Sequence, residues 1–431
     1  MRNLLCQCCC LLAFVAGAGA QAPLSFEDCV MDAAENNSDL RAASYKLRAS
    51  DYRKSAAHSG YLPQLSGDLG INRGNSGGIQ GLDGGDSNLI GSSSNKTRST
   101  AAIGLTQNLF AGFQTEAAVE QAEADRKISS ADLEIVKAQV SADLRVAFGA
   151  LQYSRNYMQL AKEIIKRRDE NYKLVELRYE SGNENKGSHL RAHAVLSEAR
   201  FDELQAGNDI RVSQQQLAKV LGRSHGDDLQ ISGAVPLDVP ESNPDFESLM
   251  KSAPEERRAW ARQLAADAAL KTAKSKFYPS LDLTGQLARE NLHGGGDDGR
   301  NRWQTGLTLR MPLFTGGSNY YGSKSALQEV LAAGSDRKSV DRSLLLTLRQ
   351  THADYLEAIA KVAVDREYVE AARVRAEIAR AKYNNGLLSF EDWDIIENDM
   401  ISRQKMLLQS EYNRIVAGAA WEQSQGKGVF P

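Results

Sequence analysis

The chain has 431 residues, and its 52 Lys and Arg against 55 Asp and Glu give a net charge of −3. This balance offers no basic field for nucleic acid, so nucleic-acid binding is not expected. Beyond the N-terminus, no apolar run approaches the roughly 18 residues of a membrane-spanning helix, whereas strands of about ten alternating residues remain compatible with the composition. Nine prolines against 35 glycines favour long helices, with glycine in a few loops.

Residues 1–20 have the features of a secretory signal peptide. Arg2 is followed by an apolar stretch and by the small residues Ala18-Gly19-Ala20, which are typical of a cleavage site. Cleavage would leave Cys29 alone of the five cysteines, so no disulfide framework is expected. The two acidic residues directly before Cys29 do not fit a lipid-attachment signal.

The chain contains one pattern twice. Tyr179-Glu180-Ser181-Gly182 recurs as Tyr383-Asn384-Asn385-Gly386, 204 residues later, and Leu109-Phe110-Ala111-Gly112 recurs at the same offset. Such repetition predicts two copies of one structural unit. We assign the first repeat to residues 21–222 and the second to 245–425, with a proline-containing linker at 223–244 and a tail at 426–431.

Each repeat opens with an expected helix of about 30 residues, over 26–58 and over 245–275. Ser25 precedes the first helix, and Asp28 follows three residues later, which is a variant of the capping box. Each opening segment is therefore predicted to be a single helix.

After each opening helix, the spacing of apolar residues changes to every second residue, which is typical of a strand. Leu65, Leu69 and Ile71 alternate with polar residues, and similar alternation predicts further strands near 100–109, 281–290 and 303–313. Four strands of about ten residues, each with one apolar face, suit a membrane β-barrel with lipid outside and water inside. An antiparallel sheet over a soluble core is the alternative. The strand connections, 74–99 and 291–302, are expected to be solvated loops.

A very long helix follows the strands in each repeat, over 113–180 and 317–383, with no proline in either. Nearly 70 residues at 1.5 Å each extend roughly 100 Å. Gly182 and Gly386 suit the left-handed residue after a helix C-terminus, and return helices are expected at 188–221 and 389–423. Frequent alanine favours close lateral packing of these helices in a wall, with the linker as a belt around them.

Together these motifs resemble those of the outer membrane efflux proteins of the TolC type. The resemblance covers about 24–425 and depends on the order and duplication of the motifs. They are the two Tyr-x-x-Gly turns, Tyr61-Leu62-Pro63-Gln64-Leu65 with its weaker copy at 277–281, Gln107-Asn108-Leu109-Phe110-Ala111-Gly112, Met311-Pro312-Leu313-Phe314-Thr315-Gly316-Gly317 and Leu217-Ala218-Lys219-Val220-Leu221-Gly222.

The residues alone predict an α plus β chain that oligomerises, because four strands cannot close a barrel and an open sheet would leave unpaired backbone groups in lipid. The resemblance implies a homotrimer with a 12-stranded transmembrane β-barrel, continued by a periplasmic α-helical barrel. It also implies an outer-membrane exit duct that works with outer-membrane lipid around it, a periplasmic adaptor protein and an inner-membrane transporter, in efflux or type I secretion.

The resemblance further implies a pore gate at the start of the last helix. Asp392 occupies the family position of a first acidic ring, which would repel like charges and attract cations. The second ring would fall near Ile395, with Asp394 beside it. The alternative is that these carboxylates are favourable charges in the first turn of a helix.

The two turns carry the remaining expected site residues. Tyr383 matches a tyrosine that the family uses to stabilise the closed turn, although Leu388 and Ser188 depart from its usual partners. The expected adaptor-docking points are Gly182, Asn183, Gly386 and Leu387.

No catalytic chemistry, cofactor or metal site is expected. His189 and His193 share a helical face at i, i+4, but no third ligand accompanies them. The segment 182–188 has its lysine on the wrong side of the glycine for a phosphate loop. Besides the channel, a periplasmic structural or adhesive coiled-coil protein with a small β-domain remains a competing hypothesis, whereas paired catalytic groups for an enzyme are not found.

Overall fold

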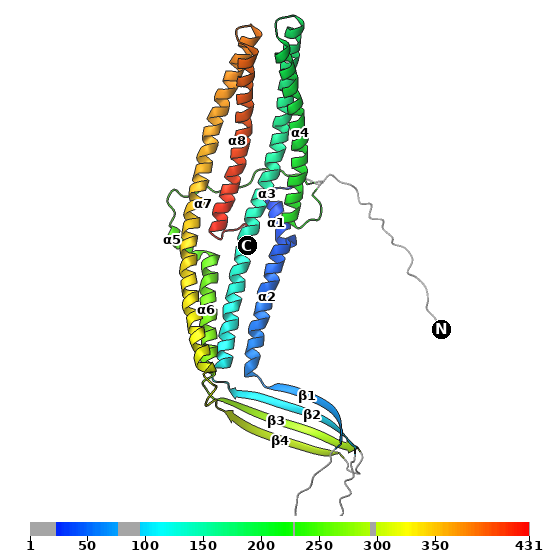
Figure 1. Ribbon diagram of the computed structural model, residues 1–431, viewed down its shortest axis with the longest axis vertical. Coiled ribbons are helices and arrows are strands. Elements are labelled where there is room, and N and C mark those ends of the chain that lie inside the picture. The colour runs from blue at the N-terminus through cyan, green and yellow to red at the C-terminus, as the bar shows by residue number, and fades with distance from the viewer. Residues whose placement is uncertain (1–22, 76–94, 227–228, 294–298, 431) are drawn as a thin grey trace, which may run out of the picture.

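The computed structural model describes residues 23–75, 95–226, 229–293 and 299–430. The predicted signal peptide, most of the predicted connection 74–99 and the middle of 291–302 lie outside these residues. The ends of both connections belong to strands, so the loops were predicted too long. Long helices lie side by side along most of the molecule, and a single four-stranded sheet occupies one end (Figure 1). Among the described helices, none combines the length and the apolar character needed to cross a membrane.

Each opening segment is divided into two helices, so the prediction of one continuous helix was wrong. In the first repeat, α1 (Phe26–Asn36) and α2 (Ser38–His58) meet at Asn37, whose side chain accepts hydrogen bonds from the backbone of Asp39 and Leu40 and donates one to Val220. In the second repeat, α5 (Phe246–Ser252) and α6 (Pro254–Ser275) are separated because Pro254 cannot continue a helix but can begin one.

The sheet joins the two repeats. Its antiparallel order is β1 (Gln64–Asn75), β2 (Asn95–Phe110), β3 (Ser280–His293) and β4 (Arg300–Arg310). Directly opposite residues share a face, and Ile103, Leu287 and Trp303 follow one another across three strands. Strand β4 ends before the predicted 313, because Pro312 lacks the N–H that a further ladder bond needs.

The predicted alternation is present on the sheet. Its apolar face is formed by odd-numbered residues, and most of the large side chains on it are exposed, although Leu281 and Leu283 are half-buried. The even-numbered face is polar: Asn108 donates to Asp282 across 2.7 Å, and Gln304 donates to Gln286 across 2.9 Å. The described strands therefore have one apolar and one polar face.

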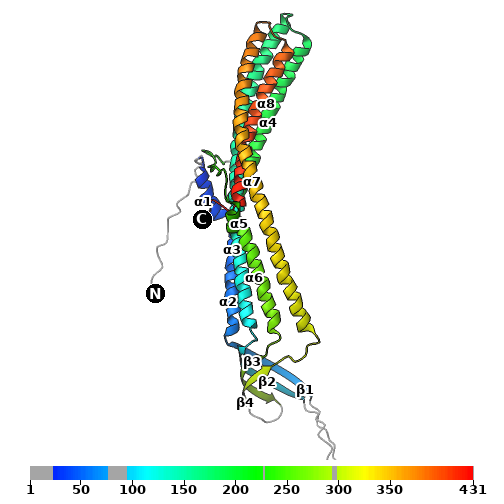
Figure 2. The same cartoon turned by 90° about the vertical axis from the view of Figure 1, so that its left-hand side faces the viewer.

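Two long helical hairpins form the other end of the molecule. They are α3 (Gln114–Glu180) with α4 (Lys186–Leu221), and α7 (Ser318–Asn384) with α8 (Phe390–Ser424). Both turns lie at the same end, opposite the sheet (Figures 1 and 2). Helices α3 and α7 have 67 residues each, about 100 Å of helix. In α3, buried alanines recur every seven residues at its sheet end and allow close packing on α2 and α6: Ala117, Ala124, Ala131 and Ala138.

The largest core lies midway along the molecule, where Phe26 and Cys29 of α1 pack among buried residues of α3 and α4. The linker between the repeats crosses this level. Arg145 of α3 donates to the carbonyl of Pro236 across 2.8 Å, and Tyr355 of α7 donates to that of Asp238 across 2.8 Å. The linker is thus bound to one long helix of each repeat.

Candidate functional site at the helix turns

The two turns have the same geometry because each repeat ends its long helix with glycine. Gly182 and Gly386 have φ of 73° and 72°, the left-handed conformation that favours glycine. The amide of Asn183 donates to the carbonyl of Arg178 at 2.7 Å, and that of Leu387 to Lys382 at 2.9 Å, which is the Schellman arrangement. No other group lies within 4 Å of a Cβ built at either glycine, so both turns are open at the tip.

The turns begin the return helices with different caps. Asn185 caps α4 by accepting from the amide of Ser188 at 2.9 Å. Ser389 caps α8: it accepts from the amide of Asp392 at 3.1 Å and donates to its carboxylate at 2.6 Å. Asp392 is exposed, so its carboxylate both stabilises the first turn of α8 and faces solvent in the single chain.

Tyr383 is the centre of the contacts between the two hairpins. Its hydroxyl donates to Glu184, in the turn of the first repeat, across 2.9 Å. Its ring is stacked on Trp393 with centroids 4.3 Å apart, and Arg178 donates to its carbonyl across 2.8 Å. Burial, aided by the bond to Glu184, raises the pKa of Tyr383, which keeps the phenol neutral.

Ion pairs to two buried carboxylates join the hairpins below the turns. Asp394 of α8, only 7% exposed, lies 2.9 Å from Arg191 of α4 and 3.7 Å from Arg168 of α3. One turn further on, Arg167 donates two bonds, of 2.6 and 2.8 Å, to the carboxylate of Glu397. The bond to Glu397 raises the pKa of Arg167, whereas burial lowers that of Arg168.

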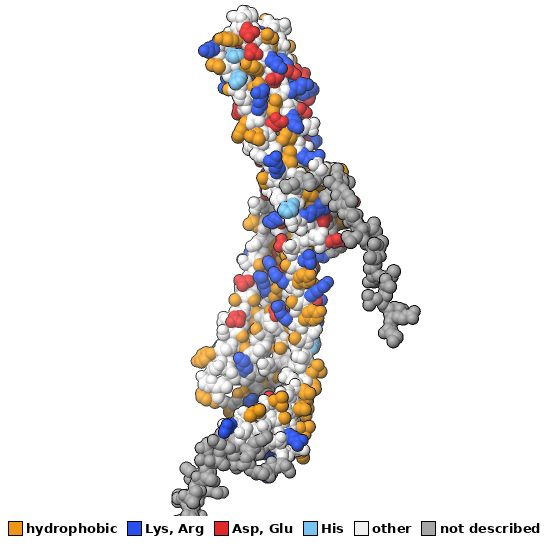
Figure 3. All heavy atoms as spheres, turned by 90° about the vertical axis from the view of Figure 1, so that its right-hand side faces the viewer, with side chains coloured by type: hydrophobic (Ala, Val, Ile, Leu, Met, Phe, Trp, Pro, Cys, Tyr) orange, Lys and Arg blue, Asp and Glu red, His pale blue; other side chains and the backbone are white. Residues whose placement is uncertain are grey.

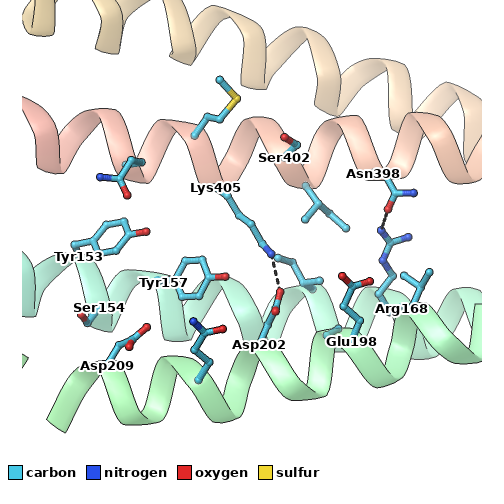
Figure 4. A pocket seen from close by; sticks show the side chains of 17 residues that line it. Tyr153, Ser154, Tyr157, Arg168, Glu198, Asp202, Asp209, Asn398, Ser402 and Lys405 are labelled. Atoms are coloured by element: carbon cyan, nitrogen blue, oxygen red, sulfur yellow. Dashed lines mark hydrogen bonds and ion pairs between the residues drawn. The ribbon is translucent and has the colours of Figure 1, made fainter. Parts of the chain in front are cut away.

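A polar cavity of about 620 Å³ lies next to these ion pairs, between α3, α4 and α8. Figure 4 shows Lys405 of α8 reaching across it to Asp202 of α4, at 2.6 Å, with Tyr157 of α3 beside them. The pair crosses the same gap between hairpins as the ion pairs at Asp394 and Glu397.

The structure separates the predicted gate residues into two groups. Asp392 lies on the exposed side of α8, where Ile395 is also exposed. Asp394 and Tyr383 are instead buried between the hairpins, and their polar groups are used within one chain. The docking residues Gly182, Asn183, Gly386 and Leu387 lie at the two tips, and the Leu387 side chain is 75% exposed.

The histidine pair on α4 packs on aromatic residues of α3. The rings of His189 and His193 lie 5.4 and 5.5 Å from that of Tyr172. In the part of the chain that the structure describes, no group of three His, Cys, Asp or Glu side chains is arranged to hold a metal ion.

The partners of Tyr383 and Asp394 were not predicted from the sequence: Glu184, Arg178, Arg168 and Arg191. For two of them, Arg178 and Arg191, the repeat offset of 204 was a usable signal. Arg191 and Asp394 are 203 residues apart, and Arg178 and Tyr383 are 205 apart. Equivalent levels of the two repeats meet because the hairpins lie side by side with their tips at one end.

The fold and turns define a class of protein: two repeats that share one sheet and build a long helical wall. The model of the outer membrane efflux protein family matches residues 30–223 and 247–427, once over each repeat, and the chain therefore belongs to that family. The predicted resemblance is confirmed, as is its consequence that the chain is an outer-membrane protein.

Individual relatives are distant. The probable outer membrane lipoprotein SilC of Salmonella typhimurium is 24% identical over 62% of this chain and 58% of its own length, and TolC of Vibrio cholerae is 23% identical over 76% of both. Thus the match spans little more than half of the SilC relative. A solved structure of CusC gives a TM-score of 0.80 at 17% identity, covering 94% of this chain and 92% of its own. A solved structure of the open state of the Neisseria gonorrhoeae MtrE channel gives a TM-score of 0.78 at 19% identity. The match covers 94% of this chain and 89% of the MtrE chain.

Proposed function

We propose that three copies of this chain form a passive exit duct in the outer membrane, for a tripartite efflux pump or a type I secretion system. The sheet carries the proposal. Strands β1 and β4 are its edges, and exposed apolar side chains cover one face. In lipid, unpaired backbone groups at an edge are unfavourable. Pairing β4 of one copy with β1 of the next removes all edges and gives a 12-stranded barrel with outer-membrane lipid around it.

The helical hairpins continue the barrel as a periplasmic wall. In this proposal the open turns at Gly182, Asn183, Gly386 and Leu387 dock a periplasmic adaptor protein, and an inner-membrane transporter supplies the energy. No residue is required to make or break a covalent bond. The repeats, 21–222 and 245–425, each contribute two strands and one hairpin, after removal of a signal peptide at 1–20.

The gate is proposed at the turns. Three Asp392 carboxylates, one per chain, form the acidic ring, which the exposed position of Asp392 supports. Tyr383 and Asp394 act differently, since both are buried: they tie the hairpin α7–α8 to the hairpin α3–α4 and so hold the entrance narrow. A second acidic ring at Asp394 is not part of the proposal.

The competing hypothesis, a periplasmic structural or adhesive protein, predicts extraction without detergent. It gives no reason for an exposed apolar face on the strands. Leu69 is 90% exposed and Trp303 is 73% exposed, which suits contact with lipid.

Planar-bilayer conductance tests the duct. Detergent-extracted oligomers of the full chain should produce discrete openings that added divalent cations block, and Asp392→Ala should weaken that block. Glu367→Ala, a change elsewhere on α7, is the control. Openings with unchanged block would remove Asp392 from the gate. Folded protein that leaves the membrane without detergent would overturn the duct.

A further inference from the structure

The two ends of the sheet, whose odd-numbered face is apolar, carry different chemistry. At the end nearest the helices, one exposed aromatic residue flanks each strand: Tyr61, Phe113, Tyr278 and Phe314. Aromatic side chains of this kind concentrate where a membrane barrel meets the interface. At the opposite end, towards the strand connections, the same face carries Arg73 on β1 and Arg289 on β3.

The strand register places these arginines on the apolar face. Leu69, Ala101 and Arg289 are directly opposite one another across β1, β2 and β3, and Arg73 lies four residues after Leu69 on its own strand. Residues in such a row, or an even number of positions apart, share one face. Both side chains are exposed.

The face is positive at this end. The carboxylates of the described strands, Asp68, Asp282 and Glu290, are all even-numbered and belong to the polar face, where Glu290 pairs with Arg98 and Arg302. Within the described chain, neither Arg73 nor Arg289 forms an ion pair with a carboxylate. Figure 3 shows hydrophobic side chains gathered at the end of the molecule that holds the sheet.

The spacing suits a bilayer. From Tyr278, which lies two residues before β3, to Arg289 is about 36 Å at 3.3 Å per residue, or roughly 28 Å across the membrane at a tilt near 40°. This span is close to the thickness of the hydrocarbon layer, about 30 Å. Arg73 and Arg289 therefore reach the headgroup level of the outer leaflet when the aromatic residues lie at the inner interface.

We infer that Arg73 and Arg289 bind anionic, phosphate-bearing lipid headgroups at the outer rim of the sheet. The inference extends the proposed function, because it requires the odd-numbered face to contact lipid. In a trimer, the two positions place six arginines on the lipid-facing side of this rim. Guanidinium groups suit this role because they donate two parallel hydrogen bonds to phosphate oxygens.

Trp303 supplies the probe for a test, because it lies on the same face, directly opposite Leu287 and beside Arg289. Full-length oligomers are reconstituted in phosphatidylcholine vesicles that contain brominated phosphatidylglycerol, or brominated phosphatidylcholine, and quenching is measured. Trp303→Phe identifies the part of the signal due to the other tryptophans. In the wild type, phosphatidylglycerol should be preferred near Trp303, by about fivefold for an arginine at the membrane surface.

The double variant Arg73→Gln/Arg289→Gln should abolish most of this preference. Arg302→Gln is the matched control, since Arg302 lies at the same height on the polar face, and it should retain the preference. Added salt should weaken the preference of the unaltered protein, which gives a test without mutation. Equal quenching by both lipids in the wild type, or an equal loss in Arg302→Gln, would overturn the inference.

The same experiment separates this inference from the duct. If neither brominated lipid quenches Trp303, the odd-numbered face does not contact lipid, and both proposals fail. If lipid preference is absent but the oligomer conducts in neutral bilayers, only the headgroup site fails.

Discussion

The hydroxyl of Tyr383 donates a 2.9 Å hydrogen bond to Glu184, and this bond joins the end of α7 to the turn between α3 and α4. The two residues belong to different repeats and are 199 positions apart. In the proposed gate the hairpins separate to widen the entrance, so this contact would oppose the movement and can be tested alone.

Tyr383→Phe should raise the open probability of the channel. The change removes the bond to Glu184 and keeps the stacking on Trp393. A hydrogen bond to a charged group contributes about 1.5–3 kcal/mol, so the ratio of open to closed states should rise roughly tenfold or more. Single-channel recording measures the ratio. Tyr179→Phe, the equivalent position in the first repeat, is the control, and an equal effect there would contradict a specific tie.

Alkali should weaken the same tie. The pKa of Tyr383 is raised in the folded chain, so its stabilising contribution is complete below about pH 10, the ordinary tyrosine value, and is lost as pH rises through the higher folded-state pKa. Thermal unfolding from neutral to strongly alkaline pH should show a steeper loss above pH 10 for the wild type than for Tyr383→Phe. Parallel curves would contradict this.

Arg167→Ala should destabilise the chain strongly. Glu397 is 1% exposed, and without Arg167 its carboxylate stays buried and loses both hydrogen bonds. Breaking a buried pair in this way costs about 3–5 kcal/mol. Denaturant unfolding measures the loss. The exposed Arg373, paired with Glu370, provides the control, because water already solvates both groups and Arg373→Ala should change stability far less. Similar losses in both variants would show that burial at Glu397 is unimportant.

Leu387→Ser should weaken adaptor binding without changing conductance. The side chain is exposed at the tip, so its replacement removes an apolar contact with the adaptor but none within the chain. Binding of a periplasmic adaptor to the immobilised oligomer should fall by about tenfold, which corresponds to burial of one leucine side chain. Val239→Ser, at another highly exposed site near the middle of the molecule, should leave binding unchanged. Unaltered binding in Leu387→Ser would remove this turn from the docking surface.

Much of the fold was predictable because it depends on local pattern. The alternation of apolar residues over Leu65–Ile71 predicts a strand, and the proline-free segments predict the long helices. The glycines that follow these helices predict the turns. The breaks at Asn37 and Ala253 were missed. The first combines a local cap by Asn37 with a distant hydrogen bond to Val220, and the second depends on the capacity of Pro254 to begin a helix.

The site was predictable only in part. Position along a repeat identified the turns, because a cap and a left-handed glycine are local features, whereas Asp392 was proposed from the family resemblance. By contrast, Asp394 lies only two residues after Asp392 but on a different side of α8, because an α-helix has about 3.6 residues per turn. This side faces the other hairpin, where Asp394 pairs with Arg191 and Arg168. Which carboxylate faces solvent depends on the packing of three helices.

The sequence by itself therefore determined the two repeats, the type and order of their elements and the family to which the chain belongs, since all of these are written in local periodicity and in motif spacing. Only the tertiary structure decided which distant groups meet. Tyr383 and Glu184 come together because both hairpins turn at the same end, and Arg289 joins the apolar face because the register of three strands aligns it with Leu69. Contacts between segments some 200 residues apart follow from packing geometry, which short-range pattern does not encode.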